Sequence, residues 1–295
     1  MERSILQDFK DGVEEYIENL CSFKEKIKNK ELIVEQIPQF TRNKLDLSSK
    51  LSILENYAKH IDDKEEKMGV KIEDLNLSDH LFHSKSSFIA PAYHLNEYLN
   101  LVEEYNINYM GKGFTEELEI IKIKFNVKVH DIFISIKSLL DRLVAIFTYY
   151  YPGITKSTTF GRIKDLKSSG LMSKVQELKD KDPLMMFIYE EYNFWIKSAV
   201  APRDIVTHYN DLGFQIKQTM DGRIIPTHIE KKLFEKHNKP TIKVSFTSEI
   251  TDEMLDDIIP TDMNYKDLIR FVNNLYDFFE KVFAYLICKD FKKIK

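Results

Sequence analysis

One segment constrains the fold of this chain more than any other, a run of apolar residues that recurs every three or four positions. The run consists of Leu118, Ile121, Phe125, Val129, Ile132, Ile136, Leu139, Leu143 and Ile146. This spacing places the apolar side chains on one face of an α-helix. We expect the helix to end at Pro152-Gly153, and a helix of this length usually forms the spine of a helical bundle.

Apolar periodicity predicts further helices on both sides of this segment. Between residues 61 and 113 the pattern loosens, apart from one short helix. The chain has only 9 Gly and 8 Pro, which agrees with long helices and few tight turns. The expected helices cover residues 1–30, 41–60, 92–105, 160–167, 171–178, a long stretch from Asp182-Pro183, and 264–290.

The periodicity changes after Asn210. Apolar residues then alternate with polar ones, which is typical of β-strands, and Asp221-Gly222 fits a hairpin turn. The alternating positions are Phe214, Ile216, Gln218, Ile242, Val244 and Phe246. We therefore expect a mainly α protein, an antiparallel helical bundle over residues 111–295 with a small β-hairpin or three-stranded insert near 213–247. An N-terminal helical region, residues 1–110, precedes it, with the boundary at Gly111-Lys112-Gly113.

Composition narrows the class of protein. With 295 residues and 43% hydrophobic content, the chain can bury a sizeable core. Two distant cysteines, Cys21 and Cys288, indicate a reducing compartment without a disulfide framework. The charged N-terminus lacks a signal-peptide core and no apolar run is long enough for a membrane span, so we expect a cytoplasmic protein without membrane contact. The net charge of −4 means that any contact with RNA comes from a local patch.

Residues 203–209, with the sequence RDIVTHY, carry the chemistry of a metal-free ribonuclease. Pro202 favours a helix start at Arg203, from which the guanidinium can reach His208. Asp204 and His208 are four residues apart, so the carboxylate can fix the imidazole tautomer and raise its pKa. Thr207 lies over Arg203 in the same way.

This segment resembles the R-x4-6-H signature of the HEPN superfamily, all-helical proteins in which a polar residue commonly follows the arginine. Asp204 occupies that place, and the resemblance covers about residues 115 to 290. It implies a metal-independent endoribonuclease without a cofactor, acting as a homodimer with facing motifs, often in toxin–antitoxin or phage-defence systems. In some such toxins a partner nucleotidyltransferase modifies a tyrosine two positions after the histidine, whereas here Tyr209 follows directly.

The catalytic candidates are Arg203, His208 and Asp204, and the substrate-binding candidates are Thr207, Tyr209, Asp141, Arg162 and Lys164. Asp141 is placed by the resemblance, in which an earlier helix contributes a polar residue to the cleft; a surface salt bridge with Lys137 or Arg142 is its alternative role. Basic residues around Arg162 predict an RNA-contacting patch or, alternatively, a solvated helix face; they include Lys156, Lys164, Lys167 and Lys174.

Two other sequence patterns do not indicate a functional site. Arg223 and His228 repeat the bare spacing, but an apolar residue follows the arginine and Pro226 interrupts, so we treat them as coincidence. The histidines at 80, 83 and 94 lack a completing carboxylate or cysteine, so we expect no metal site. The alternative functions are a non-catalytic helical module that binds a protein or nucleotide ligand, and a nucleotide-sensing regulator.

Overall fold

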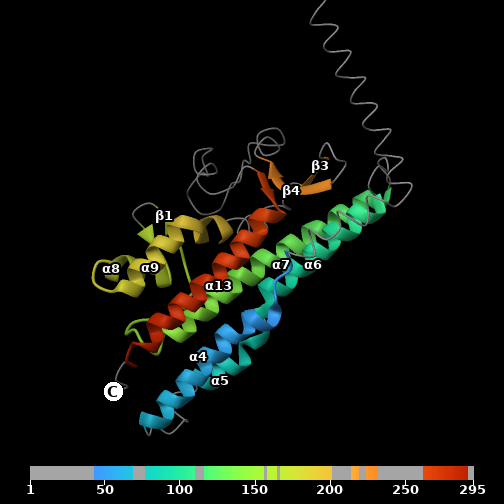
Figure 1. The fold of residues 1–295 in the computed structure, drawn as a ribbon. Helices are drawn as coiled ribbons and strands as arrows, with labels where there is room; N and C mark the ends of the chain where they lie inside the picture. Colours follow the sequence, from blue (N-terminus) through green and yellow to red (C-terminus); the bar gives the residue numbers. More distant parts are fainter. Residues whose placement is uncertain are drawn as a thin grey trace, which may run out of the picture.

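The computed structural model describes residues 43–68, 77–109, 116–155, 158–164, 167–200, 214–218, 224–230 and 262–291. These residues form a mainly α-helical bundle with a small antiparallel sheet at one end (Figure 1). The predicted fold class, a helical bundle with a β-hairpin, is thereby confirmed. The predicted N-terminal helix over residues 1–30 lies outside the described part.

Four helices from the first half of the described chain build one side of the bundle: α4 (Leu47–Met68), α5 (Leu77–His83), α6 (Lys85–Tyr109) and α7 (Glu116–Phe147). Ion pairs give their relative directions. Glu55 of α4 pairs with Lys85 at the start of α6, and Glu97 of α6 pairs with Lys128 of α7. Together with the bond between Leu45 and Asn96 and the contact between His94 and Asp131, these pairs make α6 antiparallel to both α4 and α7.

The second half adds α8 (Leu171–Leu178), α9 (Pro183–Glu191), a π-helical turn η2 (Tyr192–Ile196) and the closing helix α13 (Tyr265–Ile287). Local capping explains where α9 and α13 begin. The side chain of Asp182 accepts hydrogen bonds from the backbone N–H of Leu184 and Met185, with Pro183 in the first turn. Asn264 and Asp267 form a capping box at the start of α13.

One aromatic cluster joins α13 to its neighbours. Phe88 of α6 contacts Tyr276, Phe279 and Phe283 of α13, and the ring of Tyr57 on α4 stacks on Phe283 at 4.2 Å between centroids. Removing a buried aromatic side chain typically costs about 3–5 kcal/mol. These aromatic contacts therefore hold α4, α6 and α13 in one core across the predicted boundary near residue 110.

The described residues contain two small β-sheets. Strands β3 (Phe214–Gln218) and β4 (Ile224–Glu230) pair antiparallel, as the hairpin prediction requires, and β5 (Asp262–Asn264) adds a third strand beside β4. The expected strand over residues 242–246 and the Asp221-Gly222 turn lie outside the described part. β1 (Ile163–Lys164) and β2 (Lys167–Ser168) form the second sheet.

Four helix predictions need correction. Residues 160–164 are not helical, because the chain enters the β1–β2 hairpin through Gly161, whose φ of +76° departs from helical backbone. The helix expected over residues 41–60 continues to Met68 as α4, with the charged residues Asp62, Asp63, Glu66 and Lys67 on its exposed side. α6 is longer than the expected 92–105, and α7 ends at Phe147, with hydrogen-bonded turns continuing to Tyr151.

Candidate functional site

The predicted catalytic motif lies outside the described residues. This applies to Arg203, Asp204, Thr207, His208 and Tyr209, which fall within the gap between residues 200 and 214. The structure therefore describes the segments that precede and follow the motif in the sequence. On one side the helix that starts at Pro183 continues to Val200, and on the other the chain begins β3 at Phe214.

The helix before the motif contains the π-helical turn η2. Its defining hydrogen bond runs from the N–H of Lys197 to the carbonyl oxygen of Tyr192, five residues earlier. Trp195 is buried within this turn, and its Nε1 donates a 2.6 Å hydrogen bond to Oε2 of Glu191. Isolated π-turns in α-helices are rare and frequent at functional sites. This turn ends six residues before Pro202.

Tyr192 connects η2 to the β1–β2 hairpin. Its hydroxyl oxygen accepts a 3.0 Å hydrogen bond from the backbone N–H of Ile163, while its ring is buried. Arg162, a predicted substrate-binding residue, precedes Ile163 directly and has an exposed side chain. Lys164 is the last residue of β1, and its side chain lies outside the described part. The structure thus brings Arg162 and Lys164 to the helix that leads into the motif.

Asp141 of α7 holds the segment that leads into the β1–β2 hairpin. Its Oδ1 accepts hydrogen bonds from Nζ of Lys137 at 2.6 Å and from the backbone N–H of Phe160 at 2.7 Å. The bond from Phe160 holds the segment before β1 against α7. The salt bridge with Lys137 is the alternative role set out from the sequence. Of the proposed basic patch, Lys174 forms an ion pair with Glu177, and Lys156 lies outside the described part.

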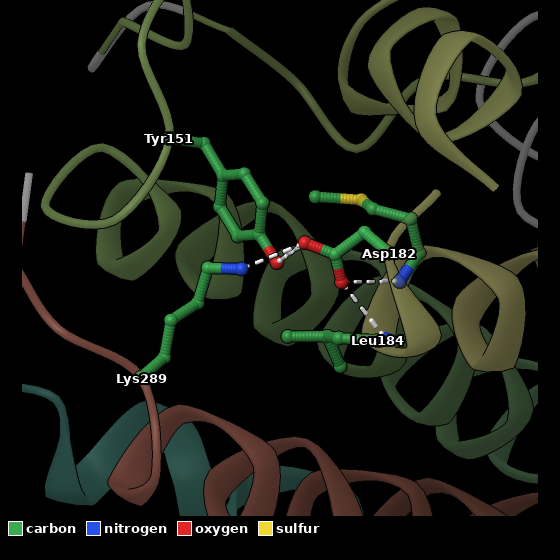
Figure 2. A network of polar contacts seen from close by, with 5 residues as sticks. Tyr151, Asp182, Leu184 and Lys289 are labelled. Atoms are coloured by element: carbon green, nitrogen blue, oxygen red, sulfur yellow. Dashed lines mark hydrogen bonds and ion pairs between the residues drawn. The ribbon is translucent and has the colours of Figure 1, made fainter. Parts of the chain in front are cut away.

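A second polar network joins three elements at the opposite end of α9 (Figure 2). Oδ2 of Asp182 accepts hydrogen bonds from the Tyr151 hydroxyl at 2.9 Å and from Nζ of Lys289 at 2.7 Å, while its Oδ1 caps α9 at Leu184. Burial raises the pKa of the Asp182 carboxyl, but the bonds from Lys289 and Tyr151 outweigh it and hold the pKa below its ordinary value of 3.8. Sequence periodicity missed this network because it joins residues far apart in the chain.

Asp182→Ala should lower the free energy of unfolding by about 2 kcal/mol, since it removes an N-cap and two side-chain hydrogen bonds. Asp182→Asn is the matched control: the amide oxygen still caps α9, so about half of the loss should return. Urea denaturation of the three proteins at pH 7 measures the difference. Equal loss in both variants would contradict the capping contribution.

The same carboxylate predicts a pH effect. A pKa held below the unfolded value contributes stability above that value, and the contribution is lost as pH falls. Wild-type protein should therefore lose stability below about pH 4 more steeply than Asp182→Asn.

The remaining histidines do not form a metal site in the described residues. No group of three His, Cys, Asp or Glu in the described ranges has a metal-binding arrangement. Nδ1 of His94 lies 3.9 Å from Oδ2 of Asp131, and burial lowers the pKa of the imidazole.

None of the described helices combines the length and apolar character needed to cross a membrane.

Comparisons with known proteins add no relative: no family model matches the chain, and neither a curated protein nor a solved structure matches it.

Proposed function

We propose that the chain is a metal-independent endoribonuclease whose reaction is carried by Arg203 and His208, and that it acts in a toxin–antitoxin or phage-defence system. The observation that carries this proposal is the RDIVTHY motif, which begins in the sequence three residues after the end of the helix that contains the π-turn. The helical bundle with a small β insert supports it, because the resemblance to HEPN proteins implies a helical fold.

The chemistry needs only groups that the motif contains. RNA supplies the nucleophile, its 2′-hydroxyl, whose proton must be removed as the oxygen attacks phosphorus. His208 takes this proton or protonates the leaving 5′-oxygen, since an imidazole exists in both forms near neutral pH. Arg203 holds two phosphate oxygens and stabilises the charge that develops on them. The products are a 2′,3′-cyclic phosphate and a 5′-hydroxyl.

A single histidine does not comfortably perform both proton transfers at once. A two-fold dimer supplies a second His208 and Arg203 to the same cleft, so a homodimer is part of the proposal. The hairpin next to η2 supplies a further contact: Arg162 is exposed there, and Tyr192 fixes the adjacent Ile163. We assign Arg162 and Lys164 to the phosphates flanking the cleaved linkage.

Incubation of purified protein with RNA in EDTA tests the proposal. Cleavage should persist without divalent metal, and the 3′ ends should carry 2′,3′-cyclic phosphate, detected by mass spectrometry of the fragments. These products follow from attack by the 2′-hydroxyl and not by water. Abolition of cleavage by chelation, or products with a free 2′-hydroxyl, would rule out this mechanism.

One observation favours the alternative, a non-catalytic module that binds a protein or nucleotide ligand. Asp141, the residue expected from an earlier helix at the cleft, is bound to Lys137 and to the Phe160 backbone. Intact RNA after long incubation, combined with a thermal shift on adding a nucleotide, would support this alternative.

A further inference from the structure

An apolar stripe lies exposed along the outer face of α7. It consists of four side chains with exposed fractions of 58%, 63%, 50% and 45%: Ile120, Ile123, Val127 and Ile134. At about 100° per residue they fall within about 60° of one another around the helix axis. Aliphatic side chains gathered in this way usually mark an interaction surface, whereas single exposed ones need no explanation.

Charged residues of both signs surround the stripe. Residues 116–134 contain three lysines, Lys122, Lys124 and Lys128, and four carboxylates, Glu116, Glu117, Glu119 and Asp131. Lys128 reaches Glu97 of α6 at 3.8 Å, and Lys124 is exposed. The apolar side chains of the stripe, rather than its charges, therefore define what can cover it.

Residues 1–20 of this chain offer a matching apolar face. Apolar residues recur there at helical spacing, at Ile5, Phe9, Val13, Tyr16 and Leu20. From Ile5 to Leu20 a helix extends about 22 Å, and from Ile120 to Ile134 about 21 Å, so the two apolar faces match in length.

The point at which the described chain begins permits this contact. Leu45 exchanges two backbone hydrogen bonds with the side chain of Asn96 on α6, and Lys44 pairs with Glu103. α6 in turn packs on α7 through the pair of Glu97 and Lys128. Successive helical residues point about 100° apart, so Asn96 does not face α7, and the connecting chain must pass around both helices, each about 10 Å across. Residues 21–42 extend up to about 70 Å, which is ample for that path.

We propose that residues 5–20 form an amphipathic helix that docks on the α7 stripe through Ile120, Ile123, Val127 and Ile134. Docking stabilises both partners, since an isolated helix of this length is only marginally stable in water and the stripe is otherwise hydrated. The N-terminal segment thus covers α7 of its own chain. This inference is independent of RNA cleavage.

Hydrogen exchange of the full-length protein, followed by mass spectrometry, tests the docking. In wild type, the amides of residues 5–20 should exchange at least about ten-fold more slowly than unstructured chain. Val127→Glu, at the centre of the stripe, should abolish this protection, and Phe9→Glu should do the same from the other partner. Phe82→Glu, at a 62% exposed position on α5, is the matched control and should leave it unchanged. Unaltered protection across α13 shows that each variant is folded.

Three results would overturn the proposal. The first is unprotected exchange of residues 5–20 in wild type, and the second is equal protection of these residues in wild type and Val127→Glu. The third is a wild-type dimer, measured by light scattering, that Val127→Glu converts to a monomer without affecting residues 5–20. The third result would assign the stripe to another copy of the chain.

Discussion

Replacing His208 by alanine is expected to slow RNA cleavage about a thousand-fold, because proton transfer by a positioned side chain contributes on this order. Arg203→Ala should cause a similar loss, since it removes the cation that stabilises the pentacoordinate phosphorus. Arg203→Lys keeps the charge but not the two-pronged geometry, so its rate should be intermediate. Single-turnover cleavage of end-labelled RNA measures all three rates on the same substrate.

The chain contains its own matched control for these variants. Arg223 and His228 repeat the spacing of Arg203 and His208. His228, however, belongs to strand β4, where it pairs with Phe214 on one side and Met263 on the other. Arg223→Ala and His228→Ala should therefore cleave RNA at the wild-type rate. Wild-type cleavage by His208→Ala, or equal losses at both pairs, would refute the assignment of the site.

The long helices could be predicted because their apolar residues follow a single period. The apolar run from Leu118 to Ile146 matches α7, and Asp182-Pro183 marks the start of α9. The π-turn at Tyr192–Ile196 could not be predicted, because buried positions three and four residues apart fit both the α- and the π-helical turn. Periodicity predicts which side is buried and not which carbonyl accepts each hydrogen bond.

Polar contacts between distant segments were equally hard to predict. Asp141 is spaced four residues from Lys137, so their salt bridge was a foreseeable alternative. Its bond to the N–H of Phe160 depends on how the chain returns after α7, which local spacing does not encode. The same limit applies to Tyr192 and Ile163, whose contact joins η2 to the hairpin. The sequence thus predicts the motif, while the supporting contacts emerge only from the fold.

That supporting hairpin depends on a close approach between two glycines. Gly161 has a φ of +76°, and a Cβ added there would lie 1.8 Å from the backbone oxygen of Ser169. Gly170 has a φ of +61°, and its added Cβ would lie 2.9 Å from Cα of Gly161. Hydrogen bonds between Arg162 and Ser169 hold the two strands at this separation. Neither backbone segment can move away from the other without breaking these hydrogen bonds.

Gly161→Ala should therefore lower the free energy of unfolding by about 3 kcal/mol, combining left-handed backbone strain with steric overlap. Gly153→Ala is the matched control: its φ is +84°, but an added Cβ meets nothing within 4 Å. It should cost only the strain, about 1 kcal/mol. Urea denaturation followed by circular dichroism measures both.

Equal destabilisation by Gly161→Ala and Gly153→Ala would mean that the hairpin shifts to accommodate the added methyl group and that the contact between Gly161 and Gly170 is not rigid. A larger loss for Gly161→Ala would instead show that the segment bearing Arg162 is held at a fixed distance from β2. Because Tyr192 bonds to Ile163 in that segment, displacement of the hairpin also disturbs η2, the helical turn that leads to Arg203. Gly161→Ala should then reduce RNA cleavage even under conditions in which the protein remains folded, whereas Gly153→Ala should not.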